Sequence, residues 1–146
     1  MSKNMNRLES VKPLDGMALE IRYTGGQVVC VNFSDFPERF AVFADMRKPD
    51  FFRAATVTDW GHTLEWPNGE GLDADRLMEM ALEQSGRNDT LEFRRWQDRN
   101  GLSLAAAAEA IGLSRRTVSQ YRTGARNVPR TVALACLGWE TSHSAT

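Results

Sequence analysis

The chain has 146 residues, enough for one ordinary domain or two small ones, and 42% of them are hydrophobic, as in globular proteins. Its formal net charge is −1, and it contains only two cysteines and two histidines. No apolar run is long enough to span a bilayer, and the polar start lacks an apolar signal core, so we expect a cytoplasmic protein that does not enter the membrane. Isolated Cys30 and Cys136 are expected to be small buried hydrophobes rather than disulfide partners or metal ligands.

The net charge is unevenly distributed along the chain. Residues 1–88 contain ten Lys or Arg and fourteen Asp or Glu, whereas residues 89–146 contain eight and five. An acidic half joined to a basic half predicts two modules with different partners. Because a polyanion would repel the acidic half, we expect that half to point away from any DNA that the basic half binds.

The acidic half begins with signals for strands and turns. Strands are expected at 11–13 and 17–23, on either side of an Asp15-Gly16 turn that favours a hairpin. Residues 27–33 are apolar and β-branched, which predicts a strand in the centre of a sheet. Between Pro37 and Pro49, residues 38–46 are expected to form a short helix.

The rest of the acidic half predicts a helical turn, a second hairpin and one longer helix. The helical turn is expected at 50–52, and the hairpin is expected from 55–59 and 63–66. Asp73 can cap a helix over 74–84, in which Leu77, Met80 and Ala81 share an apolar face. The polar segment 85–89 predicts a linker between a small α+β domain at 1–86 and a second domain at 89–146.

Several aromatic residues of this half allow two interpretations. Trp60, Trp66, Phe51 and Phe52 could line a ligand pocket, although aromatics on strands more often belong to the core. Phe36, Phe40 and Phe43 could form the surface of a homodimer built through the N-terminal domain, or they could belong to the core of the monomer.

The basic half contains the most informative stretch of the chain, residues 103–121, which predicts two short helices joined by a tight turn. Ser103 can cap the first helix, Gly112 can end it in a left-handed conformation, and Ser114 can cap the second. Ala108 is small where two helices would cross closely. The residues spaced for a buried seam are Ile111, Leu113, Val118 and Tyr121.

This stretch and the residues after it are strongly basic. No Asp or Glu occurs between Glu109 and Glu140, whereas five arginines do. Two helices around a glycine turn also occur in bundles that never touch DNA, but a solvated structural helix normally mixes charges of both signs. A cluster of basic residues that contains no acidic residue indicates a phosphate-binding surface. The five arginines are Arg115, Arg116, Arg122, Arg126 and Arg130.

At these residues the chain resembles the Cro/repressor-type helix-turn-helix family, over about residues 91–139. The resemblance implies a lambda-repressor-like all-α domain of about five short helices whose second motif helix enters the major groove of DNA. Two positions depart from the family, since Leu104 stands where many members have Gln and Arg122 where many have an acidic residue. The residues expected to read bases are Arg115, Arg116, Ser119 and Gln120. Those expected to bind phosphates are Ser114, Thr117, Arg122, Arg126 and Arg130.

The first half resembles a second family, the domain of unknown function 2442, over about residues 10–84. The resemblance rests on the order of strand and hairpin, on Trp66-Pro67-Asn68-Gly69, and on the helix that begins near Leu72-Asp73-Ala74. It implies a small α+β domain that precedes a helix-turn-helix in some bacterial proteins. Some stand-alone relatives resemble antitoxin partners.

Together these features predict an α+β protein that binds double-stranded DNA sequence-specifically and regulates transcription. The alternative is an antitoxin-type module that binds a partner protein and autoregulates its operon. An enzyme is not expected, because His62 and His143 lack catalytic partners and the sequence has no metal-ligand cluster, phosphate-binding loop or cofactor motif.

Overall fold

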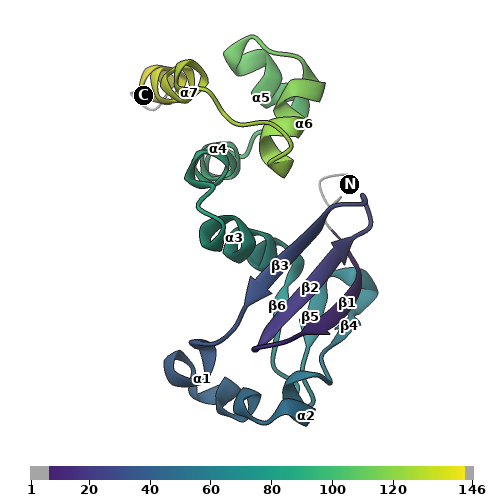
Figure 1. The fold of residues 1–146 in the computed structure, drawn as a ribbon. Coiled ribbons are helices and arrows are strands. Elements are labelled where there is room, and N and C mark those ends of the chain that lie inside the picture. The colour runs from purple at the N-terminus through teal and green to yellow at the C-terminus, as the bar shows by residue number, and fades with distance from the viewer. Residues whose placement is uncertain (1–6, 144–146) are drawn as a thin grey trace. The chain divides into compact units, whose positions relative to one another are not determined.

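The structure is a computed structural model that describes residues 7–143. The backbone separates into two compact units, with the division between Gln84 and Ser85. Within the described residues, the first unit contains all the strands together with short helices, and the second unit is helical (Figure 1). The predicted fold class, α+β followed by an all-α helix-turn-helix region, is therefore confirmed.

The first sheet is an antiparallel meander of β1 (Leu8–Leu14), β2 (Ala18–Tyr23) and β3 (Val28–Asn32), with β2 in the centre. The predicted β1–β2 hairpin is present: the three residues Asp15, Gly16 and Met17 connect Leu14 to its partner Ala18, and φ is positive at Gly16 (74°) and Met17 (54°). The prediction that the third strand is central was wrong, because β3 lies at the edge of the sheet.

Strand β3 buries only one of its two faces. Val31 is fully buried, whereas Val28 and Cys30 are exposed, so the prediction of a buried Cys30 was also wrong. A run of β-branched residues does not reveal which face of an edge strand is covered. At the end of β3, the Asn32 N–H donates to Gln84 Oε1 at 2.8 Å, and Gln84 Nε2 donates to the Asn32 carbonyl at 2.9 Å, which occupies backbone groups that the edge would otherwise expose.

The segment after β3 is helical in three short pieces: α1 (Phe36–Arg39), a 3₁₀ segment (Ala41–Arg47) and α2 (Pro49–Phe52). The prediction of one helix over 38–46 was wrong, because Phe40 adopts an extended conformation with φ −132° and ψ 115°. This break lets Phe36 and Phe43 turn toward the same core, with ring centroids 5.5 Å apart. Both rings are buried, so they belong to the core of the unit and do not form the exposed surface expected for a dimer.

The second sheet contains β4 (Thr56–Thr58), β5 (Thr63–Glu65) and β6 (Gly71–Asp73). It is also antiparallel, and β5 is its central strand. Strand β6 was not predicted. A 3₁₀ turn (Asp59–Gly61) joins β4 to β5. Trp60 lies in this turn with 86% of its surface exposed, so it belongs neither to the core nor to a pocket.

The core of the first unit lies between the sheets and α3 (Ala74–Gln84), which lies beside β3 (Figure 1). Asp73 caps α3 as predicted, because its Oδ1 accepts the N–H of Arg76 at 2.7 Å. The Phe33 and Trp66 rings meet edge to face, with centroids 5.6 Å apart. The fully buried side chains at the centre of this core include Leu19, Ile21, Val31, Phe33, Leu64, Trp66 and Leu77.

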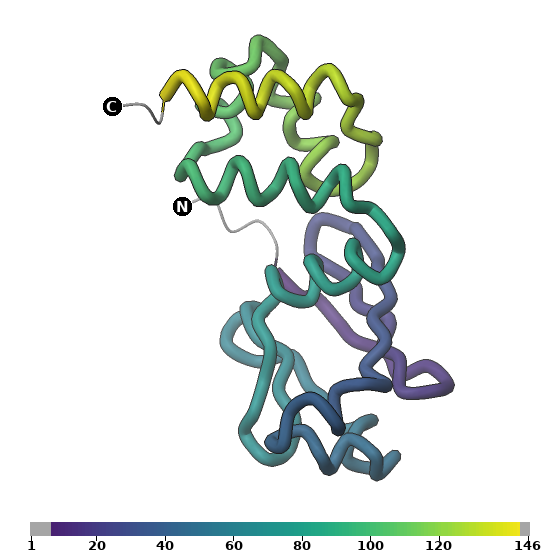
Figure 2. Tube along the Cα trace, turned by 90° about the vertical axis from the view of Figure 1, so that its left-hand side faces the viewer, coloured from purple at the N-terminus to yellow at the C-terminus, as the bar shows by residue number. Residues whose placement is uncertain are grey.

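The second unit contains four helices within the described residues, where about five were expected. They are α4 (Asn88–Arg99), α5 (Leu104–Ile111), α6 (Arg115–Thr123) and α7 (Arg130–His143), and α7 lies against both α4 and α5 (Figure 2). Since α4 begins at Asn88, the last two residues of the predicted linker are helical. The buried core of the unit consists of Phe93, Trp96, Ala107, Ala108, Val118, Tyr121 and Cys136.

Candidate nucleic-acid interface

Helices α5 and α6 form the helix-turn-helix that the sequence predicts, and each end is fixed by the expected residue. The Ser103 hydroxyl accepts the N–H of Ala106 at 3.0 Å and caps α5. Gly112 ends α5 in a left-handed conformation, with φ 71° and ψ 34°. The Ser114 hydroxyl accepts the N–H of Thr117 at 3.1 Å and caps α6. Local capping chemistry therefore sets the length of both helices and of the turn.

Helix α6 packs against the rest of the unit through one side, and this packing leaves its other residues facing solvent. Val118 and Tyr121 are buried, and the Tyr121 ring meets Phe93 of α4 with centroids 5.4 Å apart. Two other residues of the predicted seam, Ile111 and Leu113, are half-buried at the edge of the core. With Val118 and Tyr121 turned inward, helical periodicity brings the other residues of α6 toward solvent.

The four residues expected to read bases lie on this outward side of α6. Arg115 and Arg116 are exposed in its first turn, and Ser119 and Gln120 are half-buried one turn later. Within residues 7–143 neither arginine forms an ion pair, so both guanidinium groups keep their hydrogen-bond donors for a ligand.

The residues expected to bind phosphates fall into two groups. Arg126 and Arg130 are exposed, and in the described part of the chain neither has an acidic partner. Ser114 and Thr117 lie at the start of α6, where the Ser114 hydroxyl donates to Thr117 Oγ1 at 3.0 Å and also serves as the helix cap. Their hydroxyls therefore have partners already, although both lie at the end of α6 that carries a partial positive charge.

Arg122 is engaged inside the unit. Its Nη1 lies 3.1 Å from Asp98 Oδ1 and donates to Gln97 Oε1 at 3.2 Å, so the side chain fastens α6 to α4. Only 22% of this side chain is exposed. The sequence indicated a positive charge near DNA but could not indicate that α4 supplies a carboxylate, because Asp98 lies 24 residues away.

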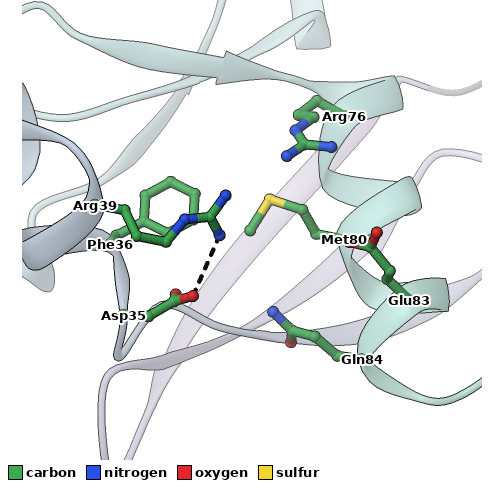
Figure 3. A pocket seen from close by; sticks show the side chains of 7 residues that line it. All are labelled: Asp35, Phe36, Arg39, Arg76, Met80, Glu83 and Gln84. Carbon is green, nitrogen blue, oxygen red and sulfur yellow. Dashed lines mark hydrogen bonds and ion pairs between the residues drawn. The ribbon is translucent and has the colours of Figure 1, made fainter.

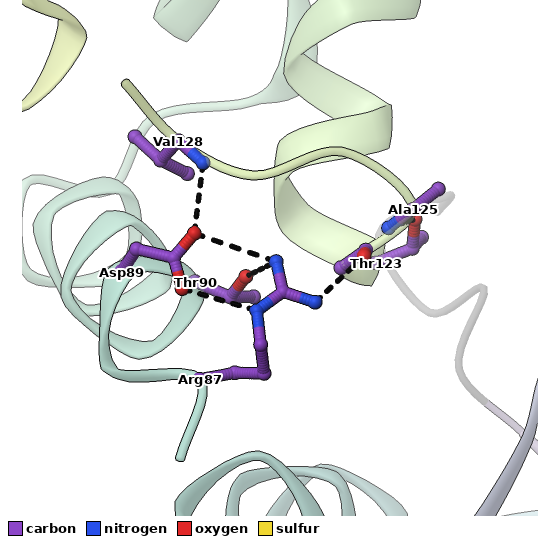
Figure 4. Close-up of polar contacts among 7 residues, drawn as sticks. Arg87, Asp89, Thr90, Thr123, Ala125 and Val128 are labelled. Atoms are coloured by element: carbon purple, nitrogen blue, oxygen red, sulfur yellow. Dashed lines mark hydrogen bonds and ion pairs between the residues drawn. The ribbon is translucent and has the colours of Figure 1, made fainter. Parts of the chain in front are cut away.

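A polar cluster that the sequence did not reveal holds the chain after α6 in place (Figure 4). Arg87 donates to the Gly124 carbonyl at 3.0 Å, to Thr90 Oγ1 at 2.9 Å and to Asp89 Oδ1 at 3.1 Å. Asp89 Oδ2 accepts the N–H of Val128 at 2.8 Å. The segment between α6 and α7 is thus fixed at both ends by residues at the start of α4.

The environment of Asp89 favours its charged form. Burial alone would raise the pKa of this carboxyl, but hydrogen bonds from Arg87 and from the backbone of Val128 and Thr90 outweigh it, and the net pKa lies below the ordinary value of 3.8. Asp89 therefore remains an anion at neutral pH and can hold the Val128 N–H and the Arg87 guanidinium together.

A buried arginine, Arg94, completes the support of α6. Arg94 is only 2% exposed, and its Nη1 donates to the Arg122 carbonyl at 3.0 Å. Arg87 and Arg94 thus bring two positive charges to the C-terminal carbonyls of α6, the end where a helix favours cations. The sequence offered no signal that distinguishes these two arginines from the exposed ones.

The end of α7 is fastened to α4 by a bidentate ion pair. Arg99 donates to both carboxylate oxygens of Glu140, at 2.7 and 2.8 Å, and Asn100 donates to the same carboxylate at 2.9 Å. Hydrogen bonds from Arg99 and Asn100 lower the pKa of Glu140 to about 2, and the same contact raises the pKa of Arg99.

Other arrangements in the described residues do not suggest chemistry. Burial raises the pKa of the Cys136 thiol to about 11, which keeps it protonated and unreactive. No group of three or more His, Cys, Asp or Glu side chains could hold a metal ion within residues 7–143. A search of the same residues finds no helix with the length and apolar character to cross a membrane.

A small hollow of about 180 Å³ lies between α1 and α3 in the first unit (Figure 3). Phe36 and Met80 lie at its apolar base, and Arg39 and Arg76 extend from its opposite sides. Arg39 pairs with Asp35 at 3.2 Å. Two arginines and two carboxylates line the hollow, so their formal charges balance.

Comparison with known proteins divides the chain at the same place. The family model described as "Protein of unknown function (DUF2442)" matches residues 8–83, and the model described as "Helix-turn-helix domain" matches residues 91–137. The crystal structure of NE0471 from Nitrosomonas europaea, described as a candidate DNA-binding protein, is 36% identical to this chain, with a TM-score of 0.66. The similarity covers 96% of this chain and 90% of that one. No curated protein sequence matches. The chain belongs to the DUF2442 family and carries a helix-turn-helix domain in its second half.

Proposed function

We propose that this protein is a sequence-specific DNA-binding regulator of transcription that reads the major groove with α6. The observation that supports this most strongly is the outward side of α6, where Arg115 and Arg116 are exposed and unpaired within the described residues of a family-matched helix-turn-helix. The similarity to a candidate DNA-binding protein agrees with it. The proposed activity is binding alone, with no catalytic step.

Base reading is assigned to Arg115, Arg116, Ser119 and Gln120. A guanidinium group can donate two hydrogen bonds to guanine O6 and N7, and a glutamine amide can pair with adenine N6 and N7. Ser119 can serve either base from the same side of the helix. The cluster around Arg87 and Asp89 supports the role of α6, since it fixes the C-terminal end of the helix that would enter the groove.

Phosphate binding is assigned to Arg126 and Arg130, together with Ser114 and Thr117 at the start of α6. Arg126 lies in the segment before α7 and Arg130 is the first residue of α7; neither has an ion pair in the described chain, so both can meet the backbone of the duplex. We leave Arg122 out of this set, because Asp98 and Gln97 already hold its guanidinium group.

The first test is selection of a binding sequence by the full-length protein from a random DNA pool. Arg115→Ala and Gln120→Ala should each weaken binding to the selected site by about 1–3 kcal/mol and relax the preference at one base position. Arg95→Ala is the matched control for loss of an arginine, because Arg95 is exposed on α4 and pairs only weakly with Glu92 at 3.5 Å. Unaltered site selection by both α6 variants, with unchanged circular dichroism, would overturn the assignment.

The second test separates phosphate contacts from base contacts. Arg126→Ala should weaken binding to all sequences about equally and reduce the slope of log affinity against log salt concentration by about 1. A loss confined to one base position would move Arg126 to the base-reading set.

A further inference from the structure

Trp60 is the most exposed large apolar side chain of the described residues. It lies in the 3₁₀ turn between β4 and β5, and 86% of its surface is open to solvent, compared with 50% for Val42, the next most exposed in the first unit. Within residues 7–143 the Trp60 ring packs against no other aromatic ring. Because an indole in water forgoes the free energy of burying a large apolar surface, its exposure calls for a reason outside the fold of this unit.

The backbone that carries Trp60 is strained. Asp59 and Trp60 have positive φ angles of 54° and 57°, and Gly61 follows at 89°. Apart from Met17, no other described residue except glycine has a positive φ. Glycine adopts this left-handed region readily, and asparagine tolerates it, but it is unfavourable for a bulky aromatic residue. Residues held in such conformations cluster at functional sites, and a turn that served only to connect two strands would not need tryptophan here.

The strands and the helix around this turn hold it in place. The His62 N–H donates to the Asp59 carbonyl at 3.0 Å, and the Ala74 N–H at the start of α3 donates to the His62 carbonyl at 2.9 Å. A Cβ atom added to Gly61 would lie 2.8 Å from the Leu8 carbonyl oxygen, so the turn packs directly against β1. A fixed turn presents the indole in one position, which reduces the conformational entropy lost when a partner binds.

The charge of the first unit indicates which kind of surface can receive the indole. Exposed tryptophans insert among lipid headgroups, stack on nucleic-acid bases or fill apolar pockets of other proteins. Residues 7–84 contain fourteen Asp or Glu and only eight Lys or Arg. Asp59, next to Trp60, has no ion pair within the described residues. A unit with this negative charge is repelled by anionic lipids and by nucleic acid, whereas a basic protein surface attracts it.

We propose that the turn between β4 and β5 docks the first unit onto a partner protein that has an apolar pocket with a basic rim. Trp60 fills the pocket, and Asp59 meets a Lys or Arg at its edge. Tryptophan in a pocket is among the residues that most often dominate the affinity of a protein interface. The proposal goes beyond the proposed function, because it assigns protein binding to the first unit and requires no contact with DNA.

The first experiment asks whether the fold needs Trp60, and it requires no partner. Trp60→Asn removes the exposed indole and places at this position a residue that tolerates a positive φ. Full-length Trp60→Asn should therefore unfold at the same denaturant concentration as the wild-type protein or at a higher one. A lower midpoint would mean that the indole supports the fold, and it would overturn the proposal.

The second experiment identifies the partner by photo-cross-linking in the cells that naturally contain the protein. Photoreactive benzoylphenylalanine, which keeps an aromatic ring, replaces Trp60 in the full-length chain. The same replacement of Val42, which is 50% exposed in the same unit, is the matched control. We expect one protein to be cross-linked from position 60 and not from position 42, and mass spectrometry identifies it. Cross-links only to nucleic acid, to lipid or to a second copy of this chain, or none at all, would overturn the proposal.

The purified cross-linked protein then provides the quantitative test. Its affinity for the full-length wild-type protein should fall at least about tenfold in Trp60→Asn and should decrease as the salt concentration rises. Val42→Ala should bind it as the wild-type protein does. Arg115→Ala should also bind it normally while DNA selection is impaired, which separates this proposal from the proposed function. Equal binding by Trp60→Asn, or an affinity that does not depend on salt, would overturn the proposed contact.

Discussion

The two units of the chain use ion pairs in different ways. In the first unit, Arg39 pairs with Asp35, Lys48 with Asp45 and Arg76 with Glu79, always within one turn of helix and at distances of 3.2 to 3.7 Å. These side chains are one-third to three-quarters exposed. Such local, solvated pairs contribute little to stability and do not determine how elements are arranged.

In the second unit, two ion pairs join helices that are far apart in the sequence, beside the local pairs Arg95–Glu92 and Arg87–Asp89. Arg99 and Glu140 are 41 residues apart, and Arg122 and Asp98 are 24 residues apart. Together with the Arg87 and Asp89 cluster, these contacts position α6 and α7 against α4. Among the described residues of this unit, the arginines without an ion pair are Arg115 and Arg116 on α6, Arg126 after it and Arg130 at the start of α7. The comparison teaches that position, and not the number of basic residues, distinguishes a structural arginine from one available to a ligand.

The largest effect is expected from a test of whether the two units are separate at all. Trp66→Ala removes a buried indole that contacts Phe33 and Phe43, and should destabilise the first unit by about 3–5 kcal/mol. The helical unit should keep its own unfolding transition, measured by circular dichroism in denaturant. We expect protease cleavage near Gly86 to release it folded.

Trp66→Phe is the matched control for this variant. It keeps an aromatic ring and removes an indole N–H that has no hydrogen-bond partner within the described residues, so it should cost much less than Trp66→Ala. Loss of both transitions together in Trp66→Ala would contradict two separately stable units.

The next largest effect is expected from the cluster that fastens the chain after α6. Asp89→Ala leaves the Val128 N–H and the Arg87 guanidinium without their shared acceptor and should destabilise the second unit by about 1–3 kcal/mol. It should also weaken DNA binding without altering base preference, because α6 loses its fixed end. Asp45→Ala removes an exposed local partner in the first unit and should change stability by less than about 0.5 kcal/mol. Equal effects of the two variants would break the comparison between the units.

These contrasts indicate what the sequence could predict. Ser103, Gly112, Ser114 and Asp73 were identified correctly because each caps or ends a helix through atoms within a few residues. The tight turn after Asp15 was predictable for the same reason. Local chemistry therefore located the helix-turn-helix and the outward side of α6 before any tertiary contact was known.

Features that depend on distant contacts were not predictable in the same way. Nothing near Phe40 in the sequence indicates that the helix is interrupted there, which lets the Phe36 and Phe43 side chains point toward the core. The Gly124 carbonyl that Arg87 binds and the Asp98 carboxylate that Arg122 binds lie far away in the sequence, so a basic cluster in the sequence could not be divided into paired and unpaired arginines. The exposed side of α7, which carries Leu134 and Leu137, was missed because uncharged residues on a helix predict burial. Sequence periodicity does not say which surface would cover them.

The Arg99–Glu140 contact predicts how the second unit responds to acid. The pKa of Glu140 is lowered from 4.5 to about 2, so its contribution to stability is complete above 4.5 and disappears as the pH falls toward 2. The wild-type protein should therefore be more stable than Glu140→Gln at pH 7, and the difference should shrink below 4.5 and disappear as the pH falls through about 2. Chemical denaturation of the two proteins across this range checks it. A difference that grows on acidification would have the wrong sign for a lowered pKa.

The smallest effect is expected from the local pair beside the hollow of the first unit. Arg39→Ala removes one ion pair at 3.2 Å between side chains that are both more than half exposed, and should change stability by less than about 0.5 kcal/mol.

Arg122→Ala is the matching variant for an ion pair between helices. This mostly covered guanidinium joins α6 to Asp98 and Gln97 of α4, and its loss leaves both side chains without a donor. We expect Arg122→Ala to cost about 1–2 kcal/mol by denaturant unfolding, and to impair DNA binding only as far as it loosens α6. If Arg39→Ala instead costs as much as Arg122→Ala, exposed local pairs stabilise this chain as strongly as those between helices, and the distinction between the two units fails.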